Sequence, residues 1–333
     1  MGMMEKGLSR RNFLAGAAAD IVGVAGAGML ASCGTPRKAD EGQSADSGQT
    51  EAAALKEPTS TRDADIVIVG SGAAGCLAAY EAAKLGVDKV LVVTKSGNAT
   101  NSNFNAITGA YAVETEGTKS IGQDYSLVDM YQRMISFAHW TVNAKLLRDC
   151  VMLLPENITI LQEMGAETAI LGDRYNAGFT CVHGFVTTDK GIPVEQALTG
   201  MGVELLYDAP TTHILMQDDK AVGIQCEQGK DVINVNAKAV LACTGGYMAN
   251  EEMLKQVYGN MTLCNMGSEK NTGDGQRMVL EAGGVEDRIH GLGMNDIYGM
   301  NAKSTISVFS MRIPSCSSPS MAVCWSTPTA SAS

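Results

Sequence analysis

Residues 64–75 read Ala64-Asp65-Ile66-Val67-Ile68-Val69-Gly70-Ser71-Gly72-Ala73-Ala74-Gly75, an apolar and β-branched run that leads directly into a glycine-rich turn. Such a run is typical of a buried strand. The chain over 76–85 is compatible with a helix throughout, and Gly86 ends it. A second β-branched run follows over 89–94. This order predicts a strand, a helix and a parallel strand, with the glycine-rich turn between the first strand and the helix.

The glycines of this turn have the spacing of a dinucleotide-binding loop. Gly70 permits a tight turn, Gly72 lets the backbone approach a pyrophosphate, and Gly75 lets the helix lie close to the strand. The pyrophosphate would then bind at the N-terminus of the helix. The candidate cofactor-binding residues of the loop are Gly70, Ser71, Gly72, Ala73, Ala74 and Gly75. A glycine-rich turn that binds nothing is the structural alternative.

The residue that ends the second strand departs from the usual pattern. Dinucleotide-binding units commonly carry an Asp or Glu there, and its carboxylate accepts hydrogen bonds from the ribose hydroxyls. Here Thr94 occupies the position and Lys95 follows it. A threonine hydroxyl can still bond the ribose, although less strongly than a carboxylate. Both residues are candidate cofactor-binding residues, and this unit alone does not distinguish NAD from FAD.

Three segments further along the chain resemble those of a known flavoprotein superfamily. The first is the small and polar stretch 98–110, and the second is the turn Thr244-Gly245-Gly246 after an apolar run over 237–243. The third is the turn Gly273-Asp274-Gly275. In this order they resemble the flavin loop, the closing strand with its turn, and the Gly-Asp-Gly segment of fumarate reductase, succinate dehydrogenase and L-aspartate oxidase flavoproteins. The similarity is to the soluble fumarate reductases and their exported relatives.

The resemblance extends from about Asp63 to about Gly293 and implies an FAD cofactor. Beyond the glycine-rich loop, Thr94 and Lys95, the cofactor-binding positions that it implies are Asn101, Ser102, Thr108, Gly109, Thr244, Gly245, Gly246, Gly273 and Asp274. In quinol-coupled members of the family, a histidine of the flavin loop links FAD covalently. Ser102 stands at that position here. The resemblance therefore implies noncovalent FAD.

The composition excludes several other classes of protein. The chain has 333 residues with 36 acidic and 25 basic side chains, and its formal net charge of −11 excludes a basic nucleic-acid-binding protein. Hydrophobic residues make up 45% of the chain and aromatic residues only 5%, which favours an α/β protein over an aromatic-rich β-sandwich. The sequence holds no CxxC pair, and its four histidines lack metal-ligand spacing. We therefore expect no metal site.

The first 33 residues resemble a twin-arginine signal joined to a bacterial lipobox. Arg10 and Arg11 precede a short, weakly apolar run, and Leu30-Ala31-Ser32-Cys33 follows it. Such a signal implies export by the twin-arginine route, cleavage before Cys33 and acylation of its thiol at the outer face of the cytoplasmic membrane. Residues 34–62, rich in small and polar types, would form a flexible tether. A soluble, Ala-rich helix with an incidental arginine pair is the alternative.

The rest of the chain divides into three predicted parts. We expect an α/β protein with a Rossmann-like FAD-binding domain over 63–250, the start of a capping and substrate region over 251–303, and an aberrant or disordered tail over 304–333. The FAD-binding domain would contain a three-layer parallel sheet and an inserted antiparallel β-meander. The capping domain of the family would be largely missing.

Hydrophobic periodicity predicts further elements within the FAD-binding domain. Apolar residues at helical spacing predict helical structure over 124–150, and a short helix is predicted over 157–164. Short strands are predicted over 203–206, 212–216, 221–227 and 231–235, with polar turns between three of them. These strands would form the meander that precedes the closing strand at 237–243.

The resemblance implies an FAD oxidoreductase of the fumarate reductase type. Such enzymes transfer hydride from reduced FAD to an activated C=C bond while a positioned acid protonates the neighbouring carbon. The substrate would be a small unsaturated acid or a similar electron-poor alkene. Electrons would come from an external redox partner, because the sequence has no CxxCH motif for haem attachment.

The sequence assigns no catalytic residue. The acid and the substrate-binding residues of the family are expected beyond the end of this chain, so the chain alone is expected to be inactive. His183 and His290 are weak candidates for an acid or a substrate contact. Two alternatives stay open: a truncated, inactive flavin-binding fragment, and an amine or amino-acid oxidase with the same FAD cradle.

Overall fold

The computed structural model describes residues 54–107, 109–171, 181–259, 265 and 267–286. Its strands are β1 (Ser60–Val69), β2 (Val90–Val93), β3 (Gly109–Tyr111), β4 (Thr168–Ile170), β5 (Val182–Phe185), β6 (Glu204–Leu206), β7 (Thr211–Gln217), β8 (Lys220–Gln228) and β9 (Asp231–Ala242). Its helices are α2 (Ala73–Lys84), α3 (Asn103–Ala106), α4 (Glu116–Ser120), α5 (Leu127–Phe137), α6 (Ala144–Glu163), α7 (Gly191–Gly200), α8 (Glu251–Tyr258) and α9 (Asp274–Glu281). The predicted signal with Cys33, Thr108, His290 and the predicted tail lie outside the described residues.

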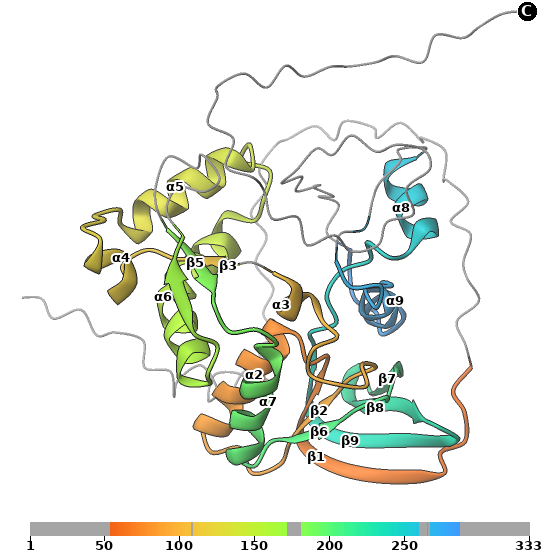
Figure 1. Ribbon diagram of the computed structural model, residues 1–333. Helices are drawn as coiled ribbons and strands as arrows, with labels where there is room; N and C mark the ends of the chain where they lie inside the picture. Colours follow the sequence, from red (N-terminus) through yellow and green to blue (C-terminus); the bar gives the residue numbers. More distant parts are fainter. Residues whose placement is uncertain (1–53, 108, 172–180, 260–264, 266, 287–333) are drawn as a thin grey trace, which may run out of the picture. The chain divides into compact units, whose positions relative to one another are not determined.

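A six-stranded sheet forms the centre of the fold, with the strand order β6-β2-β1-β9-β8-β7 (Figure 1). β1 pairs in parallel with both β2 and β9, and β2 pairs in parallel with β6. β7, β8 and β9 pair in an antiparallel manner. The structure therefore confirms an α/β fold in which parallel pairs carry the glycine-rich turn and an antiparallel meander extends the same sheet.

Both faces of the sheet are covered, which explains why the strand sequences are apolar without alternation. Val90 and Val92 of β2 pack with α2, α6 and α7 on one face, whereas Leu91 and Val93 pack on the other face with residues of β8, β9 and α9. All four side chains are buried. Figure 1 shows α2 and α7 side by side along the first face. A strand buried on both faces needs apolar residues at every position.

Two predictions about the strands need correction. The runs 231–235 and 237–243 were expected as separate strands, but β9 is one strand from Asp231 to Ala242. The polar residue between the two runs, Asn236, stays in the ladder, and its Nδ2 donates to Asp63 Oδ1 at 2.9 Å. The strand expected over 203–206 does not belong to the meander either, because β6 pairs with β2 at the opposite edge of the sheet.

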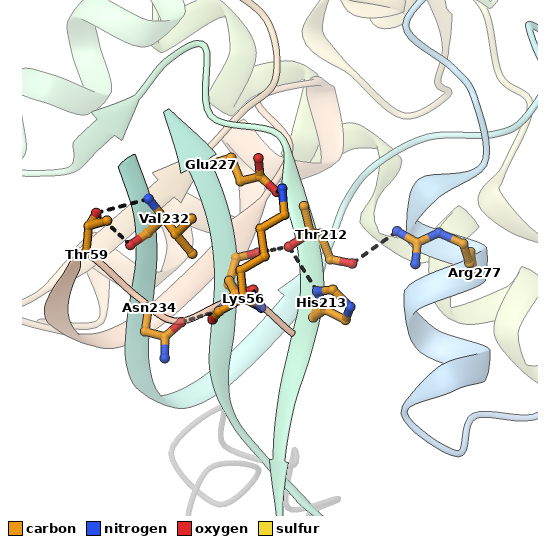
Figure 2. Close-up of polar contacts among 9 residues, drawn as sticks. Lys56, Thr59, Thr212, His213, Glu227, Val232, Asn234 and Arg277 are labelled. Atoms are coloured by element: carbon orange, nitrogen blue, oxygen red, sulfur yellow. Dashed lines mark hydrogen bonds and ion pairs between the residues drawn. The ribbon is translucent and has the colours of Figure 1, made fainter. Parts of the chain in front are cut away.

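The fold also begins earlier than the predicted boundary at Asp63. β1 starts at Ser60, which lies opposite Ile233 of β9. Upstream of the strand, Lys56 N donates to Gln225 Oε1 at 3.0 Å, and Lys56 Nζ pairs with Glu227 Oε1 at 2.8 Å. Figure 2 shows Lys56 beside Glu227 and Thr59 hydrogen-bonded to Val232. The end of the predicted tether, residues 56–62, is thus held by the sheet.

The helices differ from the predicted segments in their limits. The predicted region 124–150 contains α5 and the first part of α6, with a break between Phe137 and Ala144. The short helix expected over 157–164 is the end of the same α6, which runs through Pro155. A second sheet with the order β3-β5-β4 lies in this part of the chain. None of the helices among the described residues is long and apolar enough to span a membrane.

Candidate functional site

A cavity of about 590 Å³ lies at the carboxyl ends of β1, β2 and β9. A volume of this size is within the range of pockets that bind cofactors and other small molecules. Its position agrees with the general rule that α/β sheets bind ligands at the carboxyl ends of their parallel strands. The cavity is lined by residues 69–74, 93–96, 101–104, 107, 211, 242–245, 268, 270–271, 274–276 and 278.

The glycine-rich turn adopts the geometry that its sequence predicts. Gly70 has φ of +105°, which favours glycine over residues with a side chain. A Cβ placed on Gly75 would lie 1.9 Å from the carbonyl oxygen of Gly70, so no other residue fits there. A Cβ placed on Gly72 would meet no protein atom within 4 Å, although Gly72 lines the cavity. The turn is therefore packed behind Gly70 and Gly75 and open toward a ligand at Gly72.

The N-terminus of α2 faces this opening. Gly72 is the N-cap residue, so no side chain caps the helix, and the first turn contains no acidic residue. The first N–H groups of a helix and its dipole favour an anion at this position. A pyrophosphate is the anion for which such a turn is suited.

Three polar side chains that line the cavity contain a buried atom without a hydrogen-bond partner among the described residues. These atoms are Ser102 Oγ, Thr211 Oγ1 and Gln276 Oε1. A buried polar atom that lacks a partner costs free energy comparable to a lost hydrogen bond. These unmet hydrogen bonds therefore belong to residues that border the space where a polar ligand such as FAD would bind.

The charged residues of the lining connect β2 with α9. Lys95 Nζ pairs with Asp274 Oδ2 at 2.6 Å and donates to Thr272 Oγ1 at 2.7 Å. Thr272 Oγ1 in turn donates to Asp274 Oδ1 at 3.0 Å. Asp274 is the first residue of α9, where a carboxylate interacts favourably with the helix dipole. With Lys270, the lining carries two cations and one anion, a balance that suits an anionic ligand.

Thr94 occupies the place where a carboxylate was expected. Its side chain is buried and lines the cavity, and Oγ1 accepts a hydrogen bond from Ser96 N at 3.2 Å. The hydroxyl proton of Thr94 can therefore be donated to another acceptor. Thr94 therefore remains a candidate ribose contact, in agreement with its position in the sequence.

Most of the sequence-predicted cofactor residues lie together at the cavity. The predicted residues that line it are Gly70, Ser71, Gly72, Ala73, Ala74, Thr94, Lys95, Asn101, Ser102, Thr244, Gly245 and Asp274. The predicted residues Gly75, Gly109, Gly246 and Gly273 are not part of the lining. Gly273 is instead the N-cap of α9 with φ of +80°, and Gly109 pairs with Gly184 between β3 and β5.

Sequence reasoning missed several polar residues of the lining. Thr211 starts β7, and Ser268, Lys270 and Gln276 flank or begin α9. They approach the glycine-rich turn because α9 packs against β7. Arg277 of α9 donates from Nη2 to the carbonyl oxygen of Thr212 at 3.0 Å, as Figure 2 shows. No local pattern in the sequence predicts that contact.

His183 is a structural residue of the second sheet. It is 1% exposed and lies in β5, and its Nε2 is 2.7 Å from Thr115 Oγ1 while Nδ1 is 3.1 Å from the carbonyl oxygen of Cys181. Burial lowers the pKa of His183 below its usual value of 6.5. His183 is not among the residues that line the cavity. His183, a sequence candidate for an acid or a substrate contact, thus lies in the second sheet and not at the cavity.

A buried carboxyl group lies behind the glycine-rich turn. Glu195 of α7 is 4% exposed and accepts a short hydrogen bond from the hydroxyl of Tyr207. Burial raises its pKa, while hydrogen bonds from Tyr207 and Ser71 oppose the shift. Cys76 beside it is buried, and burial raises the pKa of its thiol to about 12. Cys76 is therefore a packing residue rather than a reactive thiol.

The side chains at the site fit an organic dinucleotide better than a metal ion. Within the described part of the chain, no group of three or more His, Cys, Asp or Glu residues could hold a metal. The open position at Gly72, the uncapped helix and the unsatisfied polar atoms all favour a long polar ligand with a pyrophosphate. The residues present therefore fit FAD.

Comparison with known proteins agrees with this geometry. Residues 65–292 match the family described as FAD binding domain. The chain is 27% identical to the vinyl phenol reductase of Lactiplantibacillus plantarum over 243 residues, which are 71% of this chain and 48% of that protein. It is 30% identical to the NADH:fumarate oxidoreductase of Klebsiella pneumoniae over 199 residues, which are 57% of this chain and 21% of that protein.

A solved structure has the same fold. The open conformation of a flavocytochrome c3 fumarate reductase superposes with a TM-score of 0.60 and 22% sequence identity, covering 68% of this chain and 41% of that one. The matched chain thus spans about half or less of the length of each of these relatives.

Proposed function

The chain belongs to the FAD binding domain family, and we propose that it is the FAD-binding part of an oxidoreductase that reduces a C=C bond. The cofactor of the family is FAD. Two relatives are named for the reduction of a C=C-containing compound, a vinyl phenol in one case and fumarate in the other. Because those two compounds share the double bond and differ in their polar groups, the proposal names the class of substrate and not one compound.

The open position at Gly72 is the observation that carries the proposal. The cavity beside it is bordered by the N-terminus of α2 and by side chains whose polar atoms need partners. The backbone of residues 70–74 would bind the pyrophosphate, and Lys95 and Lys270 would offset its negative charge. Ser102, Thr211 and Gln276 would hydrogen-bond the polar groups of the cofactor.

FAD, when bound, supplies the hydride chemistry. The contribution of this chain is to bind and orient the cofactor and to exclude water from it. Phe104 and Ile107 provide apolar surface at the lining beside Ser102 and Asn103. In quinol-coupled members of the family, a histidine at the position of Ser102 links FAD covalently. A serine side chain cannot form that link, which supports noncovalent binding.

We further propose that the protein acts outside the cytoplasm. The support is the sequence of the first 33 residues, with the arginine pair at Arg10 and Arg11 and the lipobox that ends at Cys33. Export by the twin-arginine route suits a protein that acquires FAD in the cell and folds around it before transport. An external electron donor would then reduce the flavin.

The test is a half-reaction experiment on the FAD-loaded chain. The bound flavin is reduced without oxygen by a reduced viologen, and fumarate or a vinyl phenol is then added while the flavin absorbance is recorded. The proposal predicts that an alkene reoxidises the flavin, which would overturn the sequence-based expectation that the chain alone is inactive. It also predicts that amines and amino acids do not reduce the oxidised form. Flavin reduction by an amine would instead support an oxidase. Bound flavin that reacts with none of these compounds would contradict the reductase and favour an inactive flavin-binding fragment.

A further inference from the structure

A buried lysine outside the cavity contacts the part of the flavin loop that spans residues 98–107. This part of the loop contains α3 and ends at Ile107. Lys190 directly precedes α7 and is 4% exposed. Its Nζ donates to the carbonyl oxygens of Asn105 and Ile107 at 2.8 and 3.1 Å. These carbonyls belong to α3 and to the residue after it, and each places a partial negative charge beside the ammonium group.

Two aromatic rings complete the surroundings of this ammonium group. Lys190 Nζ lies 4.9 Å from the ring centre of Phe185 and 5.6 Å from that of Phe104. The two rings pack edge to face with their centres 5.8 Å apart. Electron-rich ring faces attract a buried cation. Phe104 also lines the cavity, whereas Lys190 does not, so the ammonium group contacts a ring that borders the cavity.

The residues on either side of Lys190 bind the loop as well. Asn105 Nδ2 donates to Asp189 Oδ1 at 3.2 Å, and Gly191 N donates to Asn105 Oδ1 at 3.3 Å. A Cβ placed on Gly191 would lie 2.0 Å from the carbonyl oxygen of Ala99. Residues 189–191 therefore contact the flavin loop near its start and at its end.

If Lys190 served packing alone, burial of its ammonium group would cost free energy without a compensating gain. Burial lowers the pKa of Lys190, although the neighbouring Asp189 carboxylate opposes the shift. An apolar side chain of similar length would fill the space without the desolvation penalty of a cation. The ammonium group adds what an apolar residue cannot, namely two hydrogen bonds to the backbone of a loop that has few apolar side chains.

We propose that Lys190 is a positioning residue that holds the flavin loop in the conformation that receives the flavin half of FAD. The proposal rests on the proposed function for the identity of the ligand. Asn101, Ser102 and Asn103 of the loop line the cavity, and their placement depends on a backbone whose carbonyls at Asn105 and Ile107 are held by Lys190. The ADP half of the cofactor uses the glycine-rich turn, which Lys190 does not touch.

The experiment compares FAD with ADP as ligands of the full chain. Lys190→Met keeps the length of the side chain and removes its donors and charge, and Lys190→Gln keeps a neutral donor. Lys84→Met is the matched control, because Lys84 also lies over a ring, that of Tyr80 at 5.2 Å, but is exposed and outside the cavity. Binding is measured by flavin fluorescence for FAD and by calorimetry for ADP.

We expect Lys190→Met to weaken FAD binding about tenfold or more, which corresponds to at least about 1.4 kcal/mol, while ADP binding changes less than about twofold. Lys190→Gln should lie between the wild type and Lys190→Met, and Lys84→Met should bind both ligands normally. Hydrogen exchange of the FAD-free chain should be faster in residues 98–107 of Lys190→Met and unchanged in β1 and α2. Should Lys190→Met not fold, Lys190→Gln carries the same comparison.

Two results would overturn the proposal. The first is equal weakening of FAD and ADP binding, which indicates a general structural role. The second is unchanged FAD affinity and unchanged exchange in the flavin loop. A wild-type chain that fails to bind FAD would contradict the proposed function, and the exchange experiment, which needs no cofactor, would still decide whether Lys190 holds the loop.

Discussion

Replacement of Gly72 by valine should weaken FAD binding without a large effect on the stability of the FAD-free protein. Gly72 has φ of −73° and ψ of −175°, an extended conformation that a β-branched residue adopts readily. A Cβ at this position meets no protein atom within 4 Å. We therefore expect the free energy of unfolding of the FAD-free Gly72→Val variant to stay within about 1 kcal/mol of the wild-type value.

The substitution should instead weaken the binding of FAD. The new side chain would enter the space beside the N-terminus of α2 where the pyrophosphate must approach. The loss of one charge-assisted hydrogen bond, about 1.5–3 kcal/mol, together with about 1 kcal/mol of helix-dipole interaction, amounts to about 2.5–4 kcal/mol. At about 1.4 kcal/mol for each factor of ten, the Kd for FAD should rise by a factor on the order of a hundred to a thousand.

Two further glycines provide the controls. Gly200→Val introduces the same side chain at an exposed end of α7, where a Cβ also meets nothing within 4 Å, and should change neither stability nor FAD binding. Gly75→Ala should destabilise the fold itself, because its Cβ would lie 1.9 Å from the Gly70 carbonyl oxygen. Flavin fluorescence titration and thermal unfolding of the FAD-free proteins measure the two effects. A Gly72→Val variant with wild-type affinity for FAD would refute the assignment of the pyrophosphate site.

Three other predictions concern charges and the N-terminus. Burial raises the pKa of Glu195 above its ordinary value of 4.5, so the folded state binds this proton more tightly than the unfolded state. The free energy of unfolding should therefore fall as the pH rises from about 4.5 through the raised pKa. Denaturant unfolding at several pH values should show this dependence, and a Glu195→Gln variant with the same dependence would contradict it. Lys95→Met should weaken FAD binding by removing a cation from the lining, yet cost only about 0.5–1 kcal/mol of stability because the Lys95–Asp274 pair is partly exposed; unchanged FAD affinity in titration would disprove the electrostatic role. Cys33→Ala should release the protein from membranes, and unchanged sedimentation with them would argue against the lipid anchor.

The first strand, the helix and the second strand were predictable because their signals are local. The runs 64–69 and 89–94 correspond to β1 and β2, and the helix predicted over 76–85 corresponds to α2. The glycine-rich turn between them could be placed at the carboxyl end of β1 because its glycines restrict the backbone geometry. Gly70 and Gly75 show the expected restrictions, a positive φ and a contact too close for a side chain.

The misjudged elements contain residues whose local preference is overruled by their neighbours. Pro155 ordinarily ends a helix because it cannot donate a backbone hydrogen bond, but α6 continues through it with Ile158, Ile160 and Leu161 buried. Asn236 resembles a turn residue, yet it is held in β9 by the ladder with β1 and by Asp63. Tertiary packing decides such cases, and a single sequence does not display it.

The polar residues around the site depend on contacts that are distant in the sequence. Lys190 and Glu195 are charged residues that a local reading places at the surface, but both are buried in the structure. Thr211 and Gln276 join the cavity through the packing of α9 against β7. The sequence carries no signal for their burial, because the partners that compensate a buried charge are distant along the chain.

Release of the flavin from the denatured protein is the most direct test of noncovalent FAD binding at this site. The full chain is saturated with FAD, freed of excess ligand, denatured and precipitated, and the flavin in the supernatant and the pellet is quantified and identified by mass. Noncovalent binding at this site predicts about one FAD per chain, all of it in the supernatant, since the site binds one dinucleotide and Ser102 offers no covalent link. Flavin that stays with the precipitated polypeptide would contradict noncovalent binding, and a chain that retains no flavin at all would contradict the site itself.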